Sequence, residues 1–134
     1  MVTDTEILLR LFIAAIAGGL IGFERKTVHK PAGLRTHMIV CMGAALFVLV
    51  TIRTTPNEVA RIIAGIATGI GFLGAGAIFR AENHIKGLTT AASIWTVAAI
   101  GLTAGLGEYV LMAAATILVL LTLELNRIEF FREI

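Results

Sequence analysis

The chain has 134 residues and a net charge of +2, and 57% of its residues are hydrophobic while only 15% are charged. A water-soluble domain carries roughly 25% charged residues, because polar side chains must cover its surface. This composition therefore excludes an ordinary soluble protein, and the small net charge gives no reason to expect nucleic acid as a partner. The single cysteine, Cys41, cannot form an internal disulfide.

Five apolar segments follow one another along the chain, each close to the roughly 17–25 residues that a membrane-spanning helix needs. The predicted spans cover residues 6–25, 34–52, 56–79, 88–106 and 108–125. We predict an all-α transmembrane helix bundle of about five spans, forming a single domain over residues 1–134 with no C-terminal soluble domain. The acidic start of the chain is unlike that of a cleaved signal peptide, so the first span is expected to be retained.

Residues between the segments mark where helices begin and end. Pro31 ends the extension of the first segment. Residues 55–58, Thr-Pro-Asn-Glu, have the pattern of a capping box with proline at the first helical position, which predicts the start of the third helix. Residues 105–107, Gly-Leu-Gly, predict a tight connection between the fourth and fifth helices.

Basic residues are distributed unevenly among the connections. Eight of them lie in the first connection, the third connection and the tail: Arg25, Lys26, Lys30, Arg35, Arg80, Lys86, Arg127 and Arg132. The opposite side carries Arg53 and Arg61, with Arg10 just inside the first span, from where we expect it to extend toward the surface. The positive-inside rule then predicts an outside N-terminus and a cytoplasmic C-terminus.

Small residues recur at four-residue spacing, which lets helix backbones approach closely in a membrane. We predict that these glycines pack helices together: Gly18, Gly22, Gly65, Gly69, Gly71, Gly74, Gly76 and Gly101. Packing within one chain is the favoured interpretation. The alternative is a homo-oligomer, such as a dimer in which one of these rows of small residues packs against a second copy of the chain.

Polar residues gather where the predicted helices meet the cytoplasmic side. The candidate residues are Glu24, Arg25, Arg35, Thr36, Arg80, Thr89 and Thr90. We predict that they line a polar, cytoplasm-facing pocket that favours anions, because helices that begin there direct free N–H groups toward it. The alternative is that Arg35 or Arg80 pairs with Glu24 or Glu82 and that the threonines cap helices.

The sequence offers little for metal or enzyme chemistry. His29, His37 and His84 lack metal-ligand spacing, and we interpret them as interfacial polar residues. No metal site and no cofactor are predicted. The absence of a nucleophile–base pair or a nucleotide-binding motif argues against an enzyme.

Four motifs resemble, in order, those of the MgtC/SapB family of bacterial and archaeal membrane proteins. They are GFER at residues 22–25, AGLRTH at 32–37, GIGFLGAG at 69–76 and GLTTAA at 87–92. The resemblance implies an inner-membrane protein with four or five helices in its N-terminal domain and a role in magnesium homeostasis. It also implies a regulator that binds other membrane proteins, the F-type ATP synthase among them. Many members of the family carry a further cytoplasmic domain, which is often ACT-like.

We therefore expect a regulatory membrane protein in magnesium or ion homeostasis, acting through contacts with other membrane proteins or with itself. One alternative is a small oligomeric transporter or channel for an ion or anion. No predicted span carries an acidic residue at mid-depth, which argues against a cation pathway. A second alternative is a structural or lipid-binding bundle, with arginines holding anionic headgroups.

Overall fold

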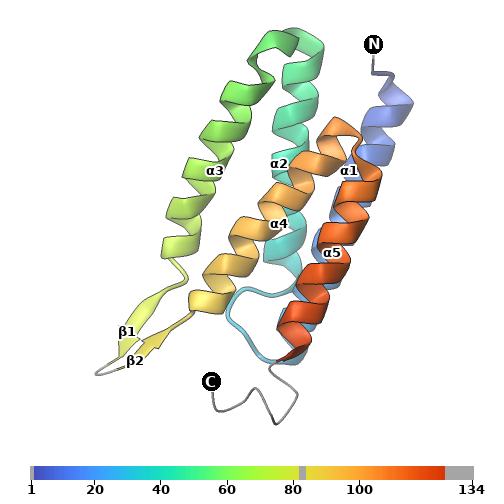
Figure 1. Ribbon diagram of the computed structural model, residues 1–134. Coiled ribbons are helices and arrows are strands. Elements are labelled where there is room, and N and C mark those ends of the chain that lie inside the picture. The colour runs from blue at the N-terminus through green and yellow to red at the C-terminus, as the bar shows by residue number, and fades with distance from the viewer. Residues whose placement is uncertain (1, 82–83, 126–134) are drawn as a thin grey trace.

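The protein is an all-α bundle, as the composition predicts. The computed structural model describes residues 2–81 and 84–125, with the side chains of residues 80, 81 and 84 outside that description. The helices in the described part run up and down alongside one another (Figure 1). They are α1 (Asp4–Thr27), α2 (Leu34–Thr54), α3 (Val59–Ala75), α4 (Leu88–Leu106) and α5 (Tyr109–Glu124), with a short 3-10 turn at Pro56–Glu58 and an antiparallel hairpin of β1 (Phe79–Ala81) and β2 (His84–Lys86).

Four of the helical stretches are long and apolar enough to cross a membrane: α1, α2, the stretch Pro56–Ala75 and α4. The fifth, α5, is also apolar but has 16 residues. The bounds of α4 match the predicted span, and α1 and α2 each extend two residues beyond the predicted C-terminal bound. The tail residues Arg127 and Arg132 lie outside the described residues.

The third helix is where the predicted bounds are wrong. It was expected over residues 56–79, but α3 ends at Ala75, and Phe79 already belongs to the hairpin. Glycine weakens a helix, and here the chain leaves α3 through tight turns in which Ala77 N–H donates to the Gly74 carbonyl at 2.9 Å.

The predicted capping box at the third helix is also wrong, because among the described residues Thr55 forms no side-chain cap bond. The box lies instead at the start of α1. There Glu6 N–H donates to Thr3 Oγ1 at 3.2 Å, and Thr3 N–H donates to a Glu6 carboxylate oxygen at 3.0 Å. Both sites have the Thr-x-x-Glu pattern, but the 3-10 turn after Thr55 changes the local geometry.

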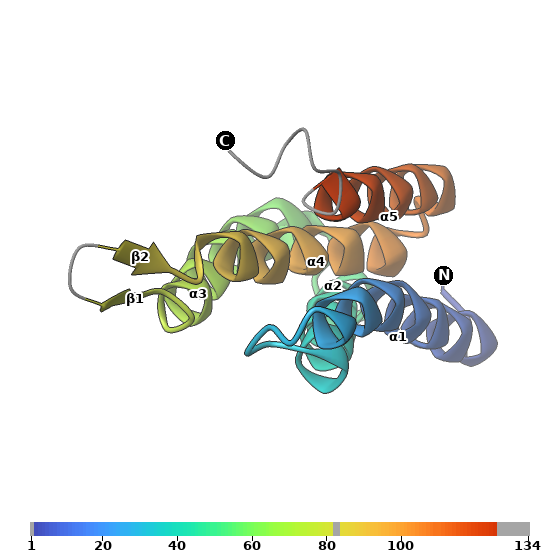
Figure 2. The same cartoon turned by 90° about the horizontal axis from the view of Figure 1, so that it is seen from below.

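The core is built by α1, α2 and α4, with α4 in contact with every other helix (Figure 2). Glycines allow the closest contacts. A Cβ added to Gly18 would lie 2.5 Å from the His37 carbonyl oxygen, and one added to Gly22 would lie 2.7 Å from Leu34 Cα. At Gly101 an added Cβ would overlap the Cys41 carbonyl. The backbones of α1 and α4 therefore lie directly against α2.

In contrast, α3 is loosely attached. Gly74 is the one residue of the described α3 helix that is buried, and it packs near the Ala91 carbonyl. Three glycines predicted to pack, Gly65, Gly69 and Gly71, have no described atom within 4 Å of an added Cβ. Within the described chain these three positions are open, and Gly76 meets only carbonyls of its own turn. The spacing identified a row of small residues on one face of the helix, but it did not show whether another helix of this chain packs against that row.

Arg10 was predicted to extend toward the surface, but it is held within the bundle. Its side chain is only 12% exposed, and its Nη1 donates to the Gly105 carbonyl at 2.8 Å. That carbonyl belongs to the last turn of α4, where a cation is favourable to the helix dipole. Arg10 therefore ties α1 to the C-terminal end of α4.

Replacing Gly101 with alanine is expected to lower the free energy of unfolding by about 1–3 kcal/mol, because the new methyl group must displace the backbone of α2. The matched control is Gly43→Ala on α2, where no described atom lies within 4 Å. That change is expected to be neutral or to stabilise by up to about 1 kcal/mol through helix propensity. Unfolding in detergent, followed by fluorescence of Trp95, measures both, and equal effects would contradict the packing described here.

Candidate functional site

The sequence-predicted polar residues lie at one end of the bundle. We call this the loop end; it comprises residues 24–37 and 77–90. It contains the α1–α2 loop, the hairpin and the start of α4, and the C-terminal end of α5 is on the same side (Figure 1). The structure does not gather the predicted residues into one pocket. It divides them between a buried pair and two hollows.

The buried pair is Glu24 and Arg25. Both side chains are buried, and Arg25 Nη2 donates to Glu24 Oε1 at 2.6 Å while Arg25 Nε contacts Glu24 Oε2. This two-point contact neutralises both charges inside the protein. The Arg25 carbonyl also accepts a hydrogen bond from Lys30 N–H at 3.0 Å, which holds the loop above the pair. Glu24 and Arg25 therefore support the loop and line neither hollow.

The first hollow lies at the start of α2 and has a volume of about 420 Å³. Its lining is Lys26, Lys30, Pro31, Gly33, Leu34, Arg35 and Thr36. None of its three cations forms an ion pair with a described residue. Arg35 and Thr36 thus share a basic surface hollow, as the sequence analysis grouped them, but with two lysines in place of Arg25.

The second hollow lies at the start of α4 and has a volume of about 670 Å³. Its lining is His29, Lys30, Pro31, Phe79, Ile85, Lys86, Gly87, Leu88, Thr89 and Thr90. His29 has a φ of 54°, a left-handed conformation that is uncommon for a residue with a side chain. Lys30 and Pro31 line both hollows, so the α1–α2 loop forms the wall between them. The Arg80 side chain lies outside the described residues.

One polar contact in the core was missed by sequence reasoning. His37 is fully buried, not interfacial, and its Nε2 lies 3.0 Å from Ser93 Oγ of α4. Its Nδ1 lies 2.9 Å from the Gly33 carbonyl, and Ser93 Oγ donates to the Thr90 carbonyl at 2.8 Å. The imidazole thus joins the starts of α2 and α4. The burial of His37 could have been predicted from helical spacing, because His37 lies on the same face of α2 as the buried residues Cys41, Ala44 and Val48.

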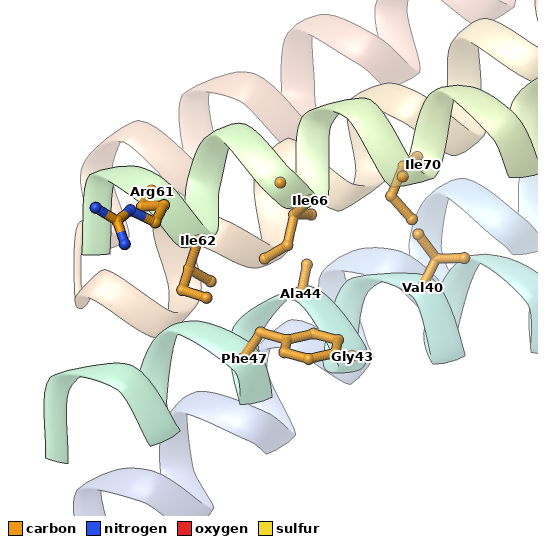
Figure 3. A pocket seen from close by; sticks show the side chains of 10 residues that line it. Val40, Gly43, Ala44, Phe47, Arg61, Ile62, Ile66 and Ile70 are labelled. Carbon is orange, nitrogen blue, oxygen red and sulfur yellow. The ribbon is translucent and has the colours of Figure 1, made fainter. Parts of the chain in front are cut away.

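A separate groove runs between α2 and α3 and has a volume of about 410 Å³. Figure 3 shows Val40, Ala44 and Phe47 of α2 facing Ile62, Ile66 and Ile70 of α3 across it. Gly43, Gly65 and Gly69 complete its lining, and Arg61, paired with Glu58 at 3.1 Å, lies at one end. The groove is apolar, and its glycines leave room for another helix backbone.

In the described part of the chain, no three His, Cys, Asp or Glu side chains come together as a metal site would need. Cys41 is buried in the core. The cationic side chains that the described residues expose at the loop end line the two hollows.

Comparison with known proteins gives a consistent set of relatives. The MgtC family is matched by residues 11–129. Protein MgtC of Salmonella typhimurium strain LT2 is 47% identical over 113 residues, which cover 84% of this chain and 49% of that protein. YhiD of Escherichia coli K12, whose name describes it as a candidate magnesium transporter, is 44% identical over 136 residues, covering 95% of this chain and 63% of the relative.

SrpB of Synechococcus elongatus is 39% identical over 143 residues, covering 92% of this chain and 79% of the relative. No solved structure matches the chain. The chain spans about half the length of the MgtC proteins that it matches.

The His37–Ser93 contact is expected to stabilise the bundle. Replacing Ser93 with alanine leaves a buried ring nitrogen without its partner, and a double-mutant cycle with His37→Leu should give a coupling energy of about 0.6–1.7 kcal/mol. The control is Thr96→Ala, since Thr96 bonds only the Ala92 carbonyl of its own helix. Unfolding in detergent measures each variant, and a coupling energy of zero would argue against this contact.

Proposed function

The chain belongs to the MgtC family, and from that premise we propose that it is a regulator of magnesium homeostasis that acts by contacting other membrane proteins. It is a multi-pass protein of the plasma (inner) membrane, with four helical stretches long enough to span a bilayer. The role in magnesium homeostasis is supported by the family and by the name of YhiD. We do not propose an enzymatic activity.

The observation that carries the proposed mode of action is the groove between α2 and α3. Lipid gives helices little hydrophobic reason to associate, so membrane partners meet through small residues that allow close approach. Gly43, Gly65 and Gly69 leave that space open along the groove. A transmembrane helix of a partner protein fits this surface, and a second copy of the chain offers the same kind of helix.

The orientation we propose places the loop end in the cytoplasm. Lys26, Lys30, Arg35 and Lys86 are exposed or partly exposed there, and the inside surface of the membrane favours connections rich in lysine and arginine. The opposite end has Arg53 paired with Asp4 at 2.7 Å and Arg61 paired with Glu58. The unpaired cations thus gather at the loop end within the described chain.

The alternative function is a small transporter, which the name of YhiD favours for that relative. Transporters place charged or polar groups near the middle of the membrane on broken helices. Here α1, α2 and α4 are continuous, and the hollows with cations lie at the loop end. These features support regulation over transport.

Filling the groove is expected to abolish function without unfolding the protein. The double substitution Gly65→Leu and Gly69→Leu adds two side chains to open space, so melting temperature and membrane level should stay near wild type. Growth of a host lacking its own family member in low magnesium should fall to that of the empty-vector strain. The control is Ala114→Leu on the exposed face of α5, which should support growth, and wild-type growth of the groove variant would refute this mode of action.

Purified protein in liposomes that hold a magnesium-sensitive dye is expected to give no protein-dependent flux, and a parallel phosphate assay is expected to give none either. Folding and insertion are checked by protease protection in the same vesicles. Flux that depends on the protein and is lost in Arg35→Gln would make this chain a transporter.

A further inference from the structure

The second hollow, at the start of α4, has features that neither the family nor the groove explains. It lies between the α1–α2 loop and the hairpin, and its lining includes Lys30, Lys86 and His29 but no acidic residue. Neither lysine forms an ion pair with a described residue. A hollow whose walls carry uncompensated cations attracts an anion.

Thr90 adds a polar group to the wall of the hollow. The residue is 2% exposed and lines this hollow, yet its hydroxyl makes no hydrogen bond within the described part of the chain. Other helix threonines, such as Thr96 and Thr116, donate to a carbonyl of their own helix. The hydroxyl oxygen is not one of the described buried atoms that lack a partner, of which Arg10 Nε is the only one, so it is accessible from the hollow and can donate its proton to a ligand there.

The backbone at this point adds further donors. α4 has 19 residues and begins after Gly87, whose φ of 91° is a conformation that suits glycine, and no described side chain caps the helix. The N–H groups of Leu88, Thr89 and Thr90 therefore have no helical carbonyl to bond. Donors of this kind, with the positive end of the helix dipole, are those that bind phosphate in many proteins.

The remaining wall of the hollow is apolar. Phe79, Ile85 and Leu88 line it and are exposed. A free phosphate would leave these side chains unused, whereas a phosphate ester with acyl chains would cover them. Lysines beside apolar surface at the edge of a membrane are also the arrangement that holds anionic headgroups.

We propose that the hollow at the start of α4 binds the phosphate group of an anionic phospholipid. Lys30 and Lys86 supply the charge, the Thr90 hydroxyl and the first N–H groups of α4 supply hydrogen bonds, and Phe79, Ile85 and Leu88 cover the start of the acyl chains. The site is separate from the α2–α3 groove. A negative result for lipid binding would therefore not contradict the proposed partner contact, and a negative result for the groove would not contradict lipid binding.

The test uses the full chain in a mild detergent and follows thermal unfolding through its single tryptophan, Trp95. The probes are short-chain phosphatidylglycerol, short-chain phosphatidylcholine and inorganic phosphate, each titrated below its micelle concentration where it has one. Phosphatidylglycerol is expected to raise the melting temperature with saturation, and phosphatidylcholine to raise it much less, because its choline is repelled by the lysines.

Two variants test the contacts. Thr90→Val keeps the shape of the side chain and removes the hydroxyl, and Lys86→Gln removes one charge. Each is expected to weaken the apparent affinity for phosphatidylglycerol about tenfold, the loss of one charge-assisted hydrogen bond. Without lipid, Thr90→Val should melt at or above the wild-type temperature, since the hydroxyl has no bond to lose among the described residues.

The matched control is Lys26→Gln, which removes a cation from the first hollow only and should leave the affinity unchanged. If inorganic phosphate stabilises the protein as well as the lipid does, with the same dependence on Thr90 and Lys86, the phosphate site stands and its lipid source is refuted. The proposal is overturned if phosphatidylglycerol stabilises the wild-type protein and the three variants equally. It is also overturned if no probe stabilises the wild-type protein.

Discussion

Close contact between backbones is the constraint on which the rest of this structure depends. Lipid chains are as apolar as the helices they surround, so helices in a membrane associate through tight packing and hydrogen bonds. Here Gly18 and Gly22 place α1 against α2, and Gly101 and Gly105 place α4 against α2 as well. A side chain at any of these four positions would separate the three helices that form the core.

The same close approach brings the loop end together. With α2 and α4 in contact, His37 reaches Ser93, and the two helix starts are held side by side. The buried Glu24–Arg25 pair then holds the loop that separates the two hollows. At the other end Arg10 binds the last turn of α4. The polar groups therefore join helices at both ends, while the middle of the core is apolar.

The helix α3, in which Gly74 is the one described glycine in close contact with another helix, borders the groove that we propose as the partner surface. Its contacts with α4 run through Gly74 and through Trp95, whose ring N–H donates to the Ala67 carbonyl at 3.2 Å. The space between α2 and α3 forms the open groove (Figure 3). The chain thus combines a tightly packed three-helix core with one more loosely packed helix, and it is this helix that the proposed mode of action uses.

The amino-acid sequence alone determined the fold class, the number of apolar segments and the bounds of α4, because a span must be apolar over its whole length and needs no tertiary information to be found. It also indicated that the polar residues gather at one end, and its motifs pointed to the family.

Only the tertiary structure decided how glycines and polar groups are used. Gly18 and Gly65 have similar spacing, yet one meets a backbone and the other open space. His37 and His29 are both near the loop end, yet one is buried against Ser93 and the other lines a hollow. Spacing along one helix specifies which residues share a face, but the neighbour that face meets is set by contacts between segments far apart in the chain.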